Sequence, residues 1–156
     1  MKKSLLILTL LIGAFITRAQ VDTVSIYDIQ YVSPATLQAC EDSSFYENKI
    51  VHFEGIISVD GNLSEVVSGS ITGGNRPFLN VVDTANGGQG GPFMGVDMMG
   101  VIDGTSDPYP GFENLLAGDR IRATCLVASY DGETQLTPIS STAIQIISSG
   151  TAPSPI

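Results

Sequence analysis

The sequence predicts an all-β domain, either a partly open Greek-key barrel of five to six strands with a short helical turn or a β-sandwich. Gly, Ser, Thr, Val and Ile dominate the chain after its first segment, and no stretch keeps a helical period of apolar residues over about twelve positions. Short alternating apolar segments recur between turns rich in Gly, Asp and Pro. Both folds produce this pattern. A short helical turn before the penultimate strand favours the barrel.

Residues 1–19 have the features of a secretory signal peptide. Lysines at positions 2 and 3 precede an apolar run over 5–16, which is shorter than the span of about 20 residues that crosses a bilayer. Thr17-Arg18-Ala19 places small residues where a signal peptidase cuts, so we expect cleavage after Ala19. An uncleaved anchor is the alternative. No later run predicts a membrane span, so the protein is expected to be secreted or on the cell surface by way of the periplasm.

The net charge of the chain limits the kinds of molecule that it can bind. Without residues 1–19 the chain keeps four basic residues against sixteen acidic ones, a formal charge of −12. Nucleic-acid affinity comes largely from Lys and Arg, so this charge makes nucleic acid an unlikely partner. Residues 20–147 fit one domain, whereas 148–156 are rich in Ser, Gly and Pro and predict a tail or linker. Other domains of a longer exported protein are therefore the partners to consider.

The first half of the domain contains three kinds of element. Residues 24–29 predict an extended segment or turn, and Ser33-Pro34 predicts the start of a short helix that ends near Cys40. The alternation over 49–59 predicts the clearest strand, which ends at Asp60-Gly61. Residues 65–71 predict either its hairpin partner or a long loop.

The second half predicts four more strands. They are expected over 78–82, 93–102, 120–130 and 134–147, the last broken at Pro138. A loop over 84–92 holds four glycines, a second loop covers 103–110, and 112–117 suits one helical turn ended by Gly118. In the strand over 120–130 the inward side chains are expected to be Ile121, Ala123, Cys125 and Val127.

Several sequence runs resemble one family of domains. GDRIRAT at 118–124 and YDGETQL at 130–136 look like the "GD-x-V-x-V-x-G…Y-x-G-x-T-Q-L" run of bacterial extracellular OB-fold domains. SIYDIQ at 25–30, VHFEGII at 51–57 and FLNVVD at 78–83 are similar to the lead-in, first strand and second strand of those domains. The resemblance covers about 24–147. It implies a five- to six-stranded OB-fold-like barrel.

The family resembled occurs in secreted and surface proteins, often beside nuclease or phosphatase domains and type IX secretion sorting domains. A signal peptide that ends in Ala-Gln is also similar to those of bacteria with type IX secretion. Its motifs are more specific for the fold than for function. Cys125 stands where the family usually has Gly, so this match is incomplete.

Cys40 and Cys125 are a candidate structural disulfide, because an exported chain with an even pair of cysteines commonly oxidises them. In an OB barrel the two regions are expected to be neighbours. Two buried free thiols are the alternative.

The sequence gives no residue set for catalysis. His52 is the single histidine, it lies inside an expected strand, and no Gly-x-Ser-x-Gly elbow accompanies it. A glycosidase cleft would need aromatic rings, but the chain has no Trp. The glycines over 87–91 lack the following Lys of a phosphate loop. We therefore expect no enzymatic activity from this domain and no cofactor.

Binding residues are expected on loops and strand ends. Tyr109 and Tyr130 are the candidate stacking rings for a ligand. Asp97, Asp103 and Asp107 are the best metal candidates, although their spacing matches no full calcium motif, so no metal is expected. The predicted function is a non-catalytic accessory or ligand-binding module of an exported or surface protein. The alternative is an oligosaccharide- or nucleic-acid-binding OB module attached to a secreted hydrolase or nuclease.

Overall fold

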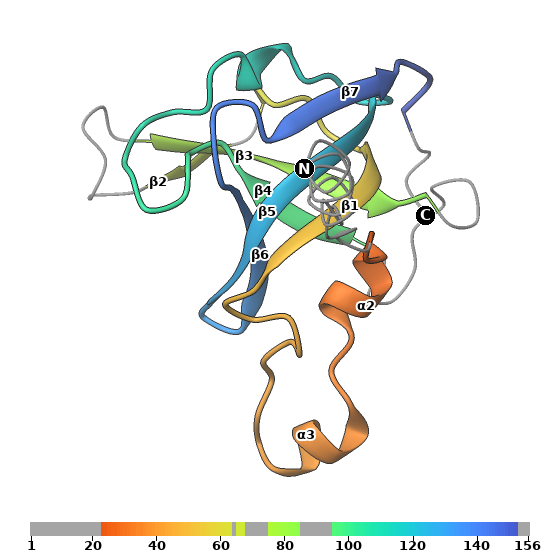
Figure 1. The fold of residues 1–156 in the computed structure, drawn as a ribbon, viewed down its shortest axis with the longest axis vertical. Helices are drawn as coiled ribbons and strands as arrows, with labels where there is room; N and C mark the ends of the chain where they lie inside the picture. Colours follow the sequence, from red (N-terminus) through yellow and green to blue (C-terminus); the bar gives the residue numbers. More distant parts are fainter. Residues whose placement is uncertain (1–22, 64, 68–74, 85–94, 153–156) are drawn as a thin grey trace, which may run out of the picture.

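The computed structural model describes residues 23–63, 65–67, 75–84 and 95–152, and the predicted signal peptide lies outside them. The structure is built mainly from strands, with short helices near the start of the described chain (Figure 1). The elements in chain order are α2 (Ile26–Gln30), α3 (Pro34–Gln38), β1 (Ile50–Ile57), β2 (Glu65–Val67), β3 (Asn75–Asp83), β4 (Gly95–Met99), the 3-10 helix η3 (Phe112–Asn114), β5 (Arg120–Tyr130), β6 (Glu133–Pro138) and β7 (Ile144–Ser148).

Five strands close into an OB-like barrel, as the sequence predicts. The pairing order is β1-β3-β4-β6-β5, and β5 pairs with β1 to complete the ring. The β4–β6 pair is parallel, whereas the other pairs of the ring are antiparallel. The additional strand β7 pairs with β5, and β2 pairs with β3. Because the ring is closed, the β-sandwich alternative does not apply.

The alternation expected for β1 and β5 is confirmed. Each barrel strand contributes fully buried apolar side chains to one interior, among them Phe53, Leu79, Met98, Ile121 and Leu136. Burial of such side chains is the main favourable term in folding, about 1.5–3 kcal/mol for each large one. The remaining faces of these strands point to solvent and are available for a site.

The segment over 24–29 is helical rather than extended. Ser25 caps α2, because its Oγ accepts a hydrogen bond from Asp28 N at 3.0 Å. Ile26 and Ile29 on the inner face of the helix are fully buried. At five residues, α2 is too short for a helical period to be visible in the sequence.

The predicted helix after Ser33 is confirmed as α3. The Ser33 Oγ accepts a hydrogen bond from Thr36 N at 3.1 Å, and Pro34 occupies the first turn. None of its five residues is buried. In Figure 1 the chain around α3 extends away from the barrel, and residues 31–48 are called the α3 lobe below.

Two predicted strands have different partners or lengths in the structure. β2 pairs with β3, not with β1, and residues 68–71 of the expected segment lie outside the described residues. β4 ends at Met99, before the expected end at 102, and residues 93 and 94 lie outside the described residues. The glycines of the loop over 84–92 lie outside the described residues.

The last predicted strand is two strands. β6 pairs with the second half of β5, whereas β7 pairs with its first half, so the chain bends after Pro138 to pass from one half to the other. The predicted tail begins too early at 148. Ser148 still pairs with Arg120, and a Cβ at Gly118 would come within 2.8 Å of Ala152 N, so the described start of the tail packs on the barrel.

The predicted disulfide is wrong. Cys40 and Cys125 are free thiols, the first exposed and the second buried. They are far apart because Cys40 lies on the α3 lobe, outside the barrel, whereas the Cys125 side chain points inward from β5. Burial raises the pKa of the Cys125 thiol, so this thiol stays protonated and acts as an apolar filler.

In the part of the chain that the structure describes, every helix falls short of the length and apolar character needed to cross a membrane.

Candidate functional site

A groove lies on the outer surface of the barrel, where β3, β4 and the β5–β6 turn face α2 and the α3 lobe. Its volume is about 530 Å³, and a second opening beside it shares three of its lining residues. The walls are formed by Gln30, Val32, Leu37, Asp42, Asn80, Gly95, Gly132 and Thr134, and the second opening adds Asp97 and Glu133. These residues together are called the groove.

The floor of the groove follows from strand alternation. Leu79 and Val81 of β3 point into the barrel, so Asn80 between them points outward. Asp97 is opposite Asn80 in the β3–β4 register. The Asn80 Nδ2 donates a hydrogen bond to Asp97 Oδ1 at 3.2 Å, and Ser58 Oγ donates to Asn80 Oδ1 at 2.9 Å. These bonds fix the orientation of the amide and the carboxylate.

One hydrogen bond and one close approach bring the walls to the floor. At the end of α2, the Gln30 Nε2 donates to the carbonyl oxygen of Gly95 at 2.5 Å. At the β5–β6 turn, Gly132 has a φ of 83°, and a Cβ there would lie 2.9 Å from Asp42 Oδ2. The positive φ favours glycine at this position, and the absence of a side chain lets the Asp42 carboxylate come close.

The groove is acidic. Asp42, Asp97 and Glu133 line it, and its described lining contains neither Lys nor Arg. An anionic ligand would have to enter against three carboxylates. Uncharged amides and hydroxyls, which both donate and accept hydrogen bonds, supply the other polar groups.

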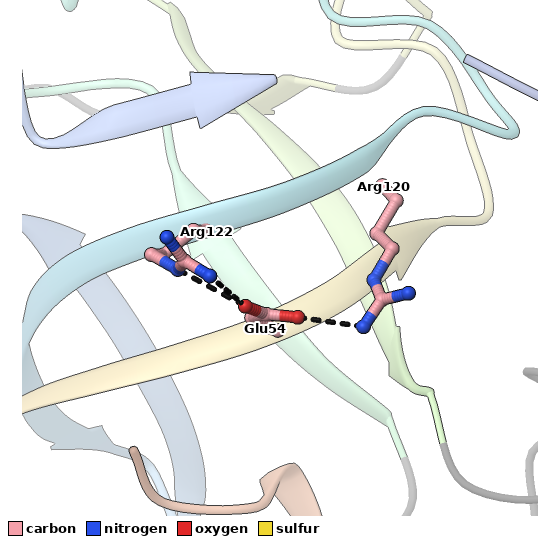
Figure 2. Close-up of polar contacts among 3 residues, drawn as sticks. All are labelled: Glu54, Arg120 and Arg122. Atoms are coloured by element: carbon pink, nitrogen blue, oxygen red, sulfur yellow. Dashed lines mark hydrogen bonds and ion pairs between the residues drawn. The ribbon is translucent and has the colours of Figure 1, made fainter. Parts of the chain in front are cut away.

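Two of the barrel's basic side chains share one carboxylate on another face. Glu54 of β1 holds Arg120 and Arg122 of β5 (Figure 2), with Oε2 at 2.7 Å from Arg120 Nη2 and Oε1 at 2.5 Å from Arg122 Nη2. The hydrogen bonds from Arg122, and then those from Arg120, lower the pKa of Glu54. The carboxylate offsets one of the two positive charges, and both arginine side chains remain about half exposed.

The two predicted stacking tyrosines are not brought together. Tyr109 is 7% exposed and packs edge-on against Phe112 with ring centroids 6.4 Å apart, so its prediction as an exposed platform is wrong. Its hydroxyl accepts a hydrogen bond from Ile144 N at 3.0 Å. Tyr130 is 66% exposed at the end of β5, outside the groove lining.

The low-ranked metal candidates are also separated. Asp97 lies in the groove, whereas Asp103 and Asp107 are exposed on the loop after β4. Across residues 23–63, 65–67, 75–84 and 95–152, no three carboxylate, histidine or cysteine side chains gather as a metal site would require. The structure therefore gives these three aspartates no common ligand.

His52 has a structural partner. Its Nδ1 lies 2.8 Å from Thr124 Oγ1, directly across the β1–β5 register. Its backbone carbonyl accepts a hydrogen bond from Val24 N at 2.7 Å. These contacts place the imidazole within the sheet surface, and no carboxylate is hydrogen-bonded to it among the described residues.

No protein family model matches this sequence, and no curated protein matches it. The groove is therefore assigned from its geometry. Of its polar residues, Asn80 and Thr134 lie on strands that the sequence predicts. Gln30 escaped prediction because α2 was not expected, and Asp42 and Gly132 because a contact between distant turns leaves no sequence pattern.

Proposed function

We propose that this chain is a non-catalytic ligand-binding module of an exported or cell-surface protein, similar to bacterial extracellular OB-fold domains. The closed barrel supports the OB-like part of the proposal. The signal-peptide features of residues 1–19 support export.

The observation that carries the proposal is the position of the groove on β3 and β4. These are the second and third strands of the barrel ring, the strands whose outer face binds oligosaccharides and oligonucleotides in OB folds. The volume of about 530 Å³ lies within the range of about 300–1,000 Å³ that is usual for ligand pockets.

The lining favours an oligosaccharide over a nucleic acid. Sugar hydroxyls donate to carboxylates and exchange hydrogen bonds with amides, which Asp97, Asn80 and Gln30 supply. A phosphate backbone would meet three carboxylates and no cation in the described groove. A neutral chain of hydroxylated rings is the ligand class that this chemistry suits.

Isothermal titration calorimetry of the exported chain with five linear hexasaccharides tests the proposal: cellohexaose, xylohexaose, maltohexaose, laminarihexaose and mannohexaose. We expect at least one to bind. Asp97→Asn should weaken binding tenfold or more, because a neutral amide oxygen is a poorer acceptor for a sugar hydroxyl than a carboxylate. The new amide oxygen can still accept the hydrogen bond from Asn80, so the local structure should be kept.

Asp103→Asn is the matched control, because Asp103 is exposed and outside the groove. It should bind like the parent chain. The proposal is wrong if none of the five hexasaccharides binds, or if the two variants bind equally well.

A further inference from the structure

A second cavity lies within the α3 lobe. Its volume is about 400 Å³, and its walls are Tyr31, Val32, Ser33, Thr36 and residues 43–45. None of these side chains is charged. Val32 also lines the groove, so the two cavities have a wall in common.

Two aromatic rings of this cavity remain exposed. Tyr31 is 39% exposed and Phe45 is 75% exposed, although burial of such rings would be favourable. An aromatic ring left exposed beside a cavity can still gain this free energy by covering the apolar face of a ligand.

Both rings are held in place by neighbours. Tyr31 stacks on Tyr27 with centroids 5.6 Å apart and planes 23° apart. The Lys49 Nζ lies 3.4 Å from the centroid of the Phe45 ring, and Tyr46 meets the same ring edge-on. Rings fixed in this way lose little side-chain entropy when a ligand binds.

Hydroxyl groups supply the polar part of the lining. The hydroxyls of Ser33 and Thr36 lie 2.8 Å apart, and Ser44 Oγ donates to the carbonyl oxygen of Ile29. The Ser44 bond ties the lobe to α2. The Ser33 Oγ already accepts from Thr36 N, and the Ser44 Oγ from Tyr46 N, so each keeps one further acceptor lone pair for a ligand.

We propose that the α3-lobe cavity is a carbohydrate subsite, which takes one sugar ring with its apolar face on Tyr31 or Phe45 and its hydroxyls on the Ser and Thr side chains. Uncharged hydroxyls beside exposed rings suit a neutral, ring-shaped, hydroxylated ligand. The subsite rests on the proposed function, because it extends the binding surface from the groove across Val32.

The test is calorimetry with the five hexasaccharides and with the disaccharide of each series. The variants are Tyr31→Ala and Phe45→Ala in the lobe, Asp97→Asn in the groove, and Tyr130→Ala as an exposed aromatic control outside both cavities. We expect at least one of the two lobe variants to weaken hexasaccharide binding fivefold or more and the control to change it less than twofold. Urea unfolding of each variant verifies that the fold is retained.

The outcomes separate the two proposals. Loss of affinity in the lobe variants supports the subsite, whether or not Asp97→Asn also weakens binding. If only the lobe variants lose affinity, the groove is not the binding site. Loss in Asp97→Asn alone retains the proposed function and overturns the subsite. If no saccharide binds the parent chain, both proposals are wrong.

Discussion

Glu54 joins β1 to β5 through two arginines, and this arrangement sets a pH dependence. Because Arg122 and Arg120 lower the pKa of Glu54 in the folded protein, the ionised carboxylate stabilises the fold above its unfolded-state pKa, near 4.5. This contribution is lost as the pH falls through the lower, folded-state pKa. The arginines are about half exposed, so solvent screens the interaction.

We expect Glu54→Gln to lower the free energy of unfolding at pH 7 by about 1 kcal/mol or less. Urea unfolding from pH 7 to pH 3 measures the difference between variant and parent, which should begin to shrink as the pH falls to about 4.5 and approach zero as it falls through the folded-state pKa. Glu41→Gln is the control, because Glu41 is exposed and takes part in neither of the ion pairs found among the described residues. A constant difference across the pH range would contradict the role given to the Glu54 carboxylate.

At the scale of elements, β7 is a short outer strand whose exposed edge is covered by a side chain. The Tyr109 hydroxyl accepts from Ile144 N at 3.0 Å and donates to the Ile144 carbonyl at 3.4 Å. A register shift between Arg120 and Ile121 also distorts the strand at Ile147. Both features protect an edge that could otherwise pair with another chain.

Tyr109→Phe should lower the free energy of unfolding by about 1–2 kcal/mol, because it leaves the Ile144 N–H and C=O without their partner. Chemical unfolding measures this change, and light scattering of concentrated solutions should show more self-association. Tyr130→Phe is the matched control, because its ring is exposed and no contact of its hydroxyl is found in the described structure. If Tyr109→Phe and Tyr130→Phe unfold at the same denaturant concentration, the Tyr109 hydroxyl does not hold β7.

Elements with strong alternation could be predicted from the sequence, whereas those defined by distant contacts could not. β1 and β5 have buried residues at every second position, so their bounds and inward faces were visible. The helix α2 was missed because it depends on Ser25 capping and on burial against the barrel. The partner of β2 was missed because tertiary packing decides which strand it pairs with. The site was predicted poorly because the exposure of Tyr109 depends on where η3 and β7 pack.

At the scale of the whole molecule, negative charge dominates. The formal net charge is −9, or −12 without the predicted signal peptide, and Glu54 occupies two of the arginines. We expect no binding of single-stranded DNA at physiological salt, because few phosphates could be neutralised. Fluorescence anisotropy with a labelled oligonucleotide checks this expectation. Micromolar binding that weakens steeply with added salt would contradict it.

The role of β5 in closing the barrel also has a consequence for how the chain folds. β5 pairs with β1, β6 and β7, and its residue Thr124 meets His52 across a separation of 72 residues. Contacts so distant in sequence carry a large loop-closure cost, and all-β proteins dominated by them fold in milliseconds to seconds. The ring cannot close until the chain beyond residue 120 has been synthesised. Late closure prolongs the unfolded state of the new chain, which is the state that passage through a membrane channel would need if the proposed export takes place.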